Sequence, residues 1–508
     1  MFCRVKSGGV LGIEGFEVDV EVDISNGLAQ FSIVGLPDKA INEAKDRVRS
    51  ALKNSDFQLP LKRITVNLSP SHVKKQGTFY DLPIALGIVK LSTGLDFPEN
   101  FIVMGELSLD GKINPVKGVL PVVISLKKLG YRRFIVPSGN AKEAGIVEGV
   151  EIYGFEKLEE VIDFLTGNLR KEPVKIDVKT LFEDSQDFDM DFSEVYGQHQ
   201  AKRAMEIAAA GFHPVMLIGP PGTGKSMLAK RLITIMPPLT FEEAIEITRI
   251  YSVAGLLNEG LPIIKRRPFR SPLTNASESA LVGGGTIPQP GEISLAHRGV
   301  LFLDEFPEFS RKAIESLRQP LEDGRVTVSR VGGRITFPSE FLMVVAMNPC
   351  TCGNYGNPYK PCVCTHMQLK AYQSRISGPI MDRIDLRVWV NPVEREDLLS
   401  MKSGETSSQI RERVIRAVEV QRERFKNSKT KYNSRMTNEE IKKYCVMTQE
   451  AQNLLKNAID RMNLTGRGYM KLLKVARTIA DLEGKEKIAS HHIADALQYR
   501  TKEKTPTL

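Results

Sequence analysis

Apolar and polar residues alternate along the first third of the chain as they do in strands and helices of one α+β unit. Residues 16–24 carry an apolar side chain at every second position, with acidic residues between them, which predicts a half-exposed strand. Further strands are predicted over residues 64–68 and 101–109, and helices over residues 39–54, 81–91 and 119–129. We therefore expect an α+β domain over residues 1–168.

A run of acidic residues separates this unit from the next. Between residues 183 and 194 there are six carboxylate side chains, no basic residue and little apolar periodicity. Such a run is typical of an exposed linker. We place an acidic linker over residues 169–191, a second unit over residues 192–395 and a third over residues 396–508.

Apolar runs alternate with helical patterns in the second unit, whereas the third unit is helical throughout. Buried strands are predicted over residues 214–218, 299–303 and 341–347, and helices over residues 201–210 and 227–235. In the third unit, helices are predicted over residues 408–425, 449–462 and 470–482. The whole chain is thus predicted to be a multidomain α/β protein: an α+β front domain, an αβα core and a helical lid.

A complete phosphate-binding motif follows the first buried strand of the second unit. The residues that fit G-x-x-x-x-G-K-[ST] are Gly219, Pro220, Pro221, Gly222, Thr223, Gly224, Lys225 and Ser226. The glycines let successive backbone N–H groups face the phosphates, Lys225 reaches the β and γ oxygens, and the Ser226 hydroxyl ligates Mg²⁺. The strand–loop–helix context makes a chance match improbable, and we predict a site for ATP and Mg²⁺.

Adjacent carboxylates end a second apolar strand, at Asp304 and Glu305. A buried strand that delivers a carboxylate to its C-terminal edge can place Asp304 on the Mg²⁺ and Glu305 on the attacking water. Alone this pattern is weak, but behind a phosphate-binding loop it predicts ATP hydrolysis.

Length, charge and cysteine content limit the class of protein. With 508 residues the chain is long enough for about three domains. Its net charge of +9 permits a nucleic-acid partner without requiring one. No apolar stretch is long enough for a membrane span or a signal peptide, so we expect a cytoplasmic protein.

Three further positions resemble the functional residues of AAA+ ATPases. Asn348 follows the strand over residues 341–347 and resembles sensor 1, which helps to place the water and the γ-phosphate. Arg383 precedes a strand at the position where ring-forming members supply an arginine finger to the neighbouring subunit. Arg375 is the alternative finger, and a purely structural pairing of Arg383 with a neighbouring aspartate is the other interpretation. Arg467 opens a helical stretch that resembles the sensor-2 helix of the lid and, by that match, reaches the γ-phosphate.

Five segments make the resemblance closer; they lie over residues 267–270, 281–285, 290–297, 317–322 and 348–350. They are similar to the magnesium-chelatase-like AAA+ proteins of the ComM/YifB type, and the match covers essentially the whole chain. The resemblance implies a homohexameric ring driven by ATP and, in the ComM branch, a DNA helicase that promotes branch migration during natural transformation. The chain departs from the family at Leu273 and Thr274, where a pair of histidines is usual.

The front domain resembles the peptidase domain of Lon proteases without its catalytic pair. Two residues after Gly77, where those enzymes place the nucleophilic serine, this chain has Phe79, and Leu120 stands where they place the lysine. A serine–lysine dyad needs a hydroxyl and an amine within hydrogen-bond reach. We therefore expect a Lon-like domain that is inactive as a protease. It also motivates the alternative function, a protein-remodelling, chelatase-like or Lon-accessory ATPase that acts on a protein partner.

A predicted β-hairpin in the second unit bears on what such a motor moves. The segment over residues 325–337 has a glycine turn and three arginines, Arg325, Arg330 and Arg334. In the AAA+ rings that the chain resembles, a hairpin before sensor 1 projects toward the central channel, so these arginines are candidates for DNA phosphates. Ordinary surface arginines are the alternative. The glycine-rich segment over residues 280–290 is a candidate second pore loop.

Four of the six cysteines lie in one short segment, Cys350, Cys352, Cys362 and Cys364. Four thiolates can close a tetrahedral Zn²⁺ site. The spacing is C-x-C rather than the commoner C-x-x-C, and His366 is a candidate replacement for one sulfur. Two interpretations of the four cysteines therefore stand: a zinc site, or reduced cysteines without a metal. In either case the segment leads directly to Arg383.

Overall fold

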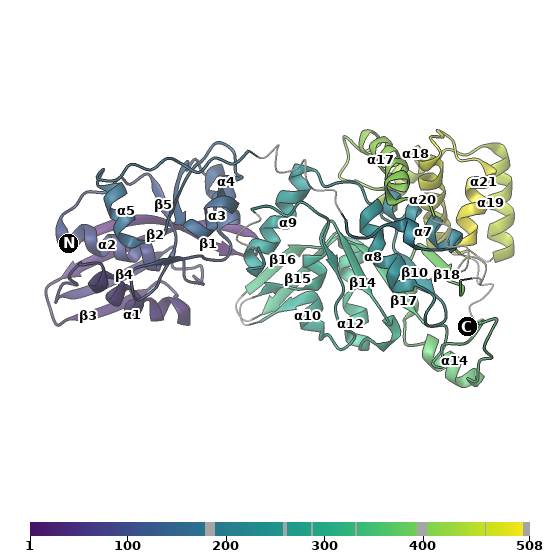
Figure 1. The fold of residues 1–508 in the computed structure, drawn as a ribbon, viewed down its shortest axis with the longest axis horizontal. Helices are drawn as coiled ribbons and strands as arrows, with labels where there is room; N and C mark the ends of the chain where they lie inside the picture. Colours follow the sequence, from purple (N-terminus) through teal and green to yellow (C-terminus); the bar gives the residue numbers. More distant parts are fainter. Residues whose placement is uncertain are drawn as a thin grey trace.

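The computed structural model describes residues 1–177, 188–257, 262–285, 288–330, 333–393, 404–462 and 464–500. They form three units along one elongated molecule (Figure 1). The first unit, in purple and blue, occupies one end. The second unit, in teal and green, lies in the middle, and the helices of the third unit pack beside it at the other end.

The first unit is built on a seven-stranded mixed sheet with the order β3-β4-β2-β1-β5-β8-β9. Its strands are β1 (Phe2–Leu11), β2 (Glu14–Ser25), β3 (Gln30–Val34), β4 (Arg63–Ser69), β5 (Phe101–Val103), β8 (Arg133–Pro137) and β9 (Glu151–Phe155). The helices are α1 (Lys39–Asn54), α2 (Asp81–Thr93), α3 (Val119–Lys128), α4 (Ser138–Gly145) and α5 (Leu158–Leu165).

Two features of this unit differ from the sequence-based expectation. The single strand predicted over residues 101–109 is wrong: the chain breaks after β5 and forms a separate short strand, β6 (Glu106–Leu107), which pairs with β7 (Ile113–Asn114). β1 was not predicted, because Gly8 and Gly9 interrupt the alternation. Helix α3 lies so close to β1 that a Cβ atom on Gly8 would come within 2.2 Å of Val122 Cγ1. Only glycine permits that approach.

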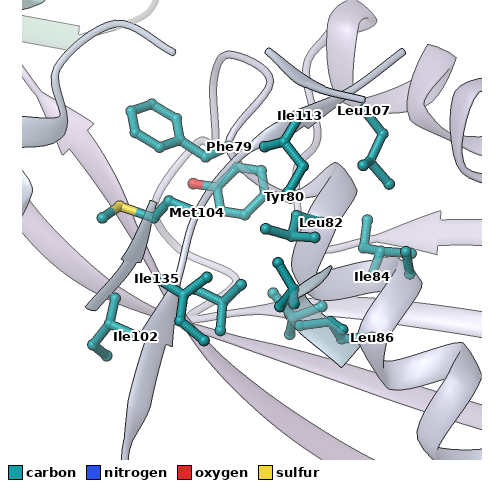
Figure 2. Packing of buried hydrophobic residues seen from close by; sticks show 14 of the residues in the cluster. Phe79, Tyr80, Leu82, Ile84, Leu86, Ile102, Met104, Leu107, Ile113 and Ile135 are labelled. Carbon is teal, nitrogen blue, oxygen red and sulfur yellow. The ribbon is translucent and has the colours of Figure 1, made fainter. Parts of the chain in front are cut away.

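The interior of the first unit is mainly apolar, with a few buried polar groups such as Asp81, which pairs with Arg47. Figure 2 shows Phe79 and Tyr80 packed with Leu82 and Met104 in this core. Phe79, at the position of the Lon-type nucleophile, is 3% exposed.

The second unit contains a five-stranded, all-parallel sheet with the order β11-β14-β17-β10-β18. Its strands are β10 (Val215–Ile218), β11 (Phe269–Arg270), β14 (Val300–Leu303), β17 (Leu342–Met347) and β18 (Leu386–Trp389). Alternate residues of β10 enter separate cores on the two faces: Val215 and Leu217 on one, Met216 and Ile218 on the other. Burial on both faces explains why these strands appear as continuous apolar runs.

Helices α7 (His199–Gly211) and α8 (Lys225–Ile235) cover one face of this sheet, and α12 (Arg311–Ser316) belongs to the core on the other. Strands β15 (Arg325–Arg330) and β16 (Gly333–Pro338) form the expected hairpin beside it. The remaining short elements are α10 (Glu278–Val282), β12 (Gly283–Gly284), β13 (Gln289–Pro290), α11 (Glu292–Leu295), α13 (Arg318–Asp323), α14 (His366–Gln373) and α15 (Gly378–Met381).

The third unit is helical, as predicted. It consists of α17 (Ser407–Arg424), α18 (Asn438–Tyr444), α19 (Gln449–Met462), α20 (Gly466–Leu482) and α21 (Ser490–Gln498). Helices α17 and α20 share one apolar core with α7 and α8 of the second unit, so the third unit is packed onto the second rather than tethered to it.

Acidic residues at the start of the second unit take part in this packing. Asp191 accepts a hydrogen bond from the Ser407 backbone N–H at 3.1 Å, and Glu194 forms an ion pair with Arg231. Asp177 and Phe188 bracket the part of the proposed acidic linker that lies outside the described residues.

The first and second units meet through α3, α4 and helix α9 (Phe241–Ala254). Leu120, on α3, is fully buried in a small apolar cluster with Ile247 of α9. The Gly118 N–H donates to the Ser252 carbonyl at 3.1 Å. Beside it, Glu143 of α4 lines a cavity of about 190 Å³ between the two units.

Among the described residues, none of the helices combines the length and the apolar character needed to cross a membrane.

Candidate active site

The phosphate-binding loop joins the C-terminal end of β10 to the first turn of α8. Gly222 and Gly224 have φ values of 78° and 84°, in the left-handed region that glycine adopts without strain. Gly219 is needed for another reason, because a Cβ atom there would lie 2.2 Å from the Val390 carbonyl oxygen. The chain therefore turns its backbone N–H groups toward one point at the N-terminus of α8, which is an anion-binding geometry.

Lys225 is largely buried in the loop. Its Nζ donates to the carbonyl oxygens of Gly219 and Pro220 at 2.7 and 2.8 Å, and to Asn348 Oδ1 at 3.3 Å. Burial lowers the pKa of this amine to about 8, although the Asp304 charge opposes the change. The amine is therefore poorly solvated, and a phosphate oxygen of a bound nucleotide would compete with these carbonyl and amide oxygens for its hydrogen bonds.

The two predicted Mg²⁺ ligands are adjacent. The Ser226 hydroxyl donates to Asp304 Oδ2 at 2.6 Å, and the Glu305 backbone N–H donates to Asp304 Oδ1 at 2.9 Å. A hydroxyl and a carboxylate at this distance suit a hard cation that prefers oxygen ligands. Glu305 has a φ of 49° and an exposed side chain, so the strand ends abruptly and presents this carboxylate to solvent at the mouth of the site.

Parallel strand order explains why these residues meet. β17 lies between β14 and β10, so Asn348 at the end of β17 stands between the carboxylates and the phosphate-binding loop. The structure thus brings together four of the residues predicted from sequence: Lys225, Ser226, Asp304 and Asn348.

Gln198 is a residue at this site that sequence reasoning did not assign. Its side-chain amide donates to the Asn391 carbonyl at 2.6 Å and to the Thr223 carbonyl at 3.4 Å. Gln198 has a φ of 55°, which marks a turn immediately before α7. A non-glycine residue in that conformation is uncommon, but the sequence carries no signal for it.

The two arginines expected at the γ-phosphate lie together on another face. Arg383 and Arg467 both line a cavity of about 510 Å³ at the contact between the second and third units. Further basic residues line the same cavity, Arg435, Lys471 and Lys474. Within one chain, Arg467 is therefore grouped with Arg383 and not with Lys225.

Arg383 is anchored by acceptors other than its neighbouring aspartates. It forms an ion pair with Glu322 and donates to the Pro379 carbonyl at 2.6 Å. Its Nε has no hydrogen-bond partner among the described residues. Arg375, the alternative finger, forms an exposed ion pair with Glu308 at 2.7 Å.

A buried polar network fixes the segment that carries Arg383. Asp385 Oδ2 lies 2.8 Å from His213 Nδ1, and its Oδ1 accepts from Lys471 Nζ at 2.6 Å. Although burial acts to raise it, Lys471 and His213 hold the pKa of Asp385 well below its ordinary range. Because Lys471 lies on α20, the network ties the Arg383 segment to the helix that carries Arg467. Arg477, on the same helix, is 1% exposed and pairs with Asp481, which is a structural role.

Comparisons with known proteins cover all three units. Family models of magnesium chelatase match in succession: subunit ChlI of Mg-chelatase over residues 20–140, magnesium chelatase subunit ChlI over residues 191–398, and its C-terminal part over residues 404–500. The chain is 43% identical over 505 residues to competence protein ComM of Haemophilus influenzae, covering 98% of this chain and 97% of that protein. The chain belongs to the ComM/YifB family of magnesium-chelatase-like AAA+ ATPases. A YifB protein of Salmonella typhimurium is 42% identical over 502 residues, which are 98% of this chain and 96% of the relative.

This member of the ComM/YifB family is only partly similar to Lon. Identity to the archaeal Lon protease of Methanocaldococcus jannaschii is 27% over 144 residues, 28% of this chain and 22% of that enzyme. Phe79 and Leu120 are both buried, the first in the core of the front unit and the second against α9. These two positions therefore carry apolar side chains that pack in a core, where Lon proteases carry a nucleophile and an amine.

The four cysteines of this family member come from the two ends of one short segment and converge in space. Cys350 Sγ lies 3.4 Å from Cys352 Sγ and 3.7 Å from Cys362 Sγ, and the last two are 3.6 Å apart. With Cys364 they form a group whose sulfur atoms all lie within 4.8 Å of one another. Tetrahedral Zn²⁺ with Zn–S bonds of about 2.3 Å requires sulfurs about 3.8 Å apart, so the donor set fits zinc. His366 is the first residue of α14 and is not in this group.

The hairpin has one buried and one exposed face. Val326, Val328, Ile335 and Phe337 enter the core, and Thr327 and Thr336 pair on the other face. Arg325 and Arg334 are exposed. For Arg330, the structure describes the backbone, in β15, and not the side chain. β12 and β13 pair in the glycine-rich segment, of which residues 286 and 287 lie outside the described part.

Proposed function

We propose that this protein is a ring-forming ATPase that couples ATP hydrolysis to movement on DNA. The observation that carries the proposal is the division of one catalytic set between two faces of the subunit. Lys225, Ser226, Asp304 and Asn348 lie at the edge of the parallel sheet, whereas Arg383 and Arg467 lie in a separate basic cavity. A head-to-tail contact between copies would complete the site, and a repeated contact of this type closes a ring.

Each residue then has a defined task. The backbone of the loop and Lys225 hold the phosphates, while Ser226 and Asp304 would hold Mg²⁺, which neutralises charge on the phosphate oxygens. Glu305 is placed to accept a proton from the attacking water, and Asn348 to orient that water. Arg383 and Arg467 of the adjoining subunit stabilise the charge that develops on the γ-phosphate.

DNA is the proposed substrate because of the hairpin and the family. Arg325 and Arg334 project from a rigid hairpin whose other face is anchored in the core. The chain has a net charge of +9, and its relative is named a competence protein. We infer a helicase or branch-migration activity in transformation or recombination, with a homohexamer as the working form.

The four cysteines are proposed to bind Zn²⁺ as a structural ion. The Tyr355 N–H donates to Cys350 Sγ at 3.3 Å, a backbone contact of the type that supports metal-bound thiolates. One zinc per chain by metal analysis, lost in a Cys352→Ser/Cys362→Ser variant, is the expected result. A zinc-free protein with four titratable thiols would overturn it.

The decisive experiment compares ATP hydrolysis by the full-length protein without DNA and with single-stranded, forked and duplex DNA. We expect stimulation by single-stranded or forked DNA, together with an affinity that falls as salt rises. Absence of both DNA binding and stimulation would overturn the proposal. Stimulation by a captured protein instead of DNA would favour the rival, a protein-remodelling or Lon-accessory ATPase.

A further inference from the structure

The cysteine-rich segment exposes a group of large apolar side chains. Tyr359, Val363 and Met367 are 60%, 80% and 81% exposed, and we call them the cysteine-loop patch. Tyr359 lies in the loop between the two cysteine pairs, Val363 lies between Cys362 and Cys364, and Met367 is in the first turn of α14. Single exposed apolar residues are ordinary, but three from one short, compact segment mark a contact surface.

This segment is packed directly against the nucleotide site. A Cβ atom on Gly353, in the cysteine loop, would lie 2.8 Å from Pro221 Cδ of the phosphate-binding loop. Tyr372, on α14, is buried in the same apolar core as Phe306 and Phe309, which follow Glu305 in the chain. Whatever covers the mouth of the nucleotide site therefore also approaches the patch.

The charges around the mouth of the nucleotide site indicate which kind of partner covers the cysteine-loop patch. Asp304 and Glu305 make the mouth acidic, whereas the charges of Glu308 and Arg375 cancel in their ion pair. A nucleic-acid backbone would be repelled by these carboxylates. Five basic and three acidic side chains line the cavity that holds Arg383 and Arg467, so this cavity, which lies on another face of the same chain, has an excess of positive charge. Acidic mouth and basic cavity are complementary, as the two sides of a head-to-tail contact need to be.

We propose that the cysteine-loop patch is covered by a second copy of this chain, in the same contact that brings that copy's basic cavity to the nucleotide site. The inference rests on the proposed function and adds to it a specific part of the interface. The four sulfur atoms hold the loop in the shape that presents the patch. The cysteine cluster thus serves subunit assembly, and the metal proposed for it has no part in the chemistry.

The test is a Val363→Asp/Met367→Asp variant of the full-length chain, with Leu61→Asp as the matched control. Leu61 is 89% exposed on the first unit. Sedimentation with ATP measures the assembly, and a fluorescent ATP analogue measures binding to single subunits. We expect the double variant to need at least tenfold more protein than the wild type to assemble, with unchanged nucleotide affinity. The control should assemble as the wild type does.

A second test mixes two variants that are each expected to be slow and measures whether ATP hydrolysis is regained. Arg383→Ala lacks the arginine but keeps its patch, and the double variant lacks the patch but keeps its arginine. Each alone should hydrolyse ATP slowly. Their mixture should regain activity, because the Arg383→Ala subunit can receive Arg383 from the double variant.

The outcomes separate this inference from the proposed function. If the wild type assembles and the double variant assembles equally well, the inference fails and the ring proposal stands. The inference also fails if the double variant loses only its affinity for single-stranded DNA, since the patch would then bind nucleic acid. A wild type that stays monomeric with ATP while hydrolysing it rapidly would overturn both. Chelation of zinc should reproduce the assembly defect of the double variant, and intact assembly of zinc-free protein would contradict the role given to the sulfur cluster.

Discussion

At the scale of single residues, Glu305 shows how backbone conformation supports a catalytic assignment. Two residues after the end of β14, Glu305 has a φ of 49°, which a non-glycine residue adopts at some cost in free energy. The turn places Glu305 at the mouth while its own N–H fixes Asp304 by a hydrogen bond of 2.9 Å. The two adjacent carboxylates therefore have different roles: Asp304 is held beside Ser226, and Glu305 is free to receive a proton.

A Glu305→Gln variant is expected to bind ATP with unchanged affinity and to hydrolyse it at least about 100-fold more slowly, because the amide cannot accept the proton of the attacking water. Steady-state turnover and equilibrium binding of ATP check this. A Glu308→Gln variant is the control, since Glu308 pairs with Arg375 instead. Normal turnover by Glu305→Gln would remove Glu305 from this role.

At the scale of elements, one face of the β15–β16 hairpin anchors it in the protein and the other face is available for contact with a partner. Its apolar positions enter the core of the second unit, and the turn between β1 and β2 touches it, since a Cβ on Gly12 would come within 2.6 Å of Ile335 Cγ2. The hairpin is therefore anchored along its buried face, and Arg325 and Arg334 lie on the exposed face.

An Arg325→Glu/Arg334→Glu variant is expected to bind single-stranded DNA at least tenfold more weakly, with a salt dependence reduced by about two phosphate contacts. ATP hydrolysis without DNA should not change. Affinities measured over a series of salt concentrations check this. The control, Arg416→Glu/Arg422→Glu on the exposed side of α17, alters net charge equally, and an equal loss in both variants would mean that only net charge matters.

The joint between α4 and α9 contains a carboxyl group whose ionisation opposes folding. Asn140 donates to Glu143 Oε1 at 2.7 Å, but Oε2 has no partner among the described residues. Burial raises the pKa of Glu143 from 4.5 to about 7. The folded chain thus binds this proton more tightly than the unfolded chain does, so its contribution is favourable below pH 4.5 and is lost as pH rises to about 7.

A Glu143→Gln variant is therefore expected to be more stable than the wild type at pH 8, by up to about 3 kcal/mol, with the gain shrinking steadily toward pH 5. Urea-induced unfolding at several pH values measures the difference. Glu148→Gln, an exposed carboxylate on the same unit, should show no such trend. A gain that does not vary with pH would mean that packing, and not ionisation, controls the joint.

At the scale of the whole molecule, the buried network around Asp385 joins the second and third units. His213, Lys471 and Asp385 connect the sheet, the Arg383 segment and α20 by contacts of 2.6 to 2.8 Å. The basic cavity is consequently a fixed feature of the subunit surface, ready to meet a neighbouring nucleotide site.

ATP hydrolysis per subunit is expected to rise with protein concentration and to level off once assembly is complete, because a single subunit lacks an arginine at its own phosphates. An Arg383→Ala variant should assemble but turn over at least about 100-fold more slowly. Activity and sedimentation measured over the same concentration range check both statements. Rapid turnover by a proven monomer would contradict them.

Much of this architecture was predictable because it depends on neighbours in sequence. The helix over residues 39–54 and the helix over residues 449–462 occur with the predicted bounds, since amphipathic periodicity is a local property. The break after β5 and the strand β1 were missed, because both are decided by packing against other elements: β1 tolerates its glycines only since α3 lies across them.

The chemistry of phosphate binding was determined by the sequence alone, because a nucleotide's phosphates are recognised by the backbone and side chains of one contiguous loop, residues 219–226. Tertiary structure decided the rest. It grouped Arg383 with Arg467 away from that loop, drew four sulfur atoms together, set Gly353 of their loop against Pro221, and buried Leu120 against α9. The cysteine cluster was also visible in the spacing of one short segment. The arginine pair, the contact of Gly353 with Pro221 and the burial of Leu120 join segments far apart in the chain, and packing sets such contacts without leaving a periodic or spacing signal in the residues themselves.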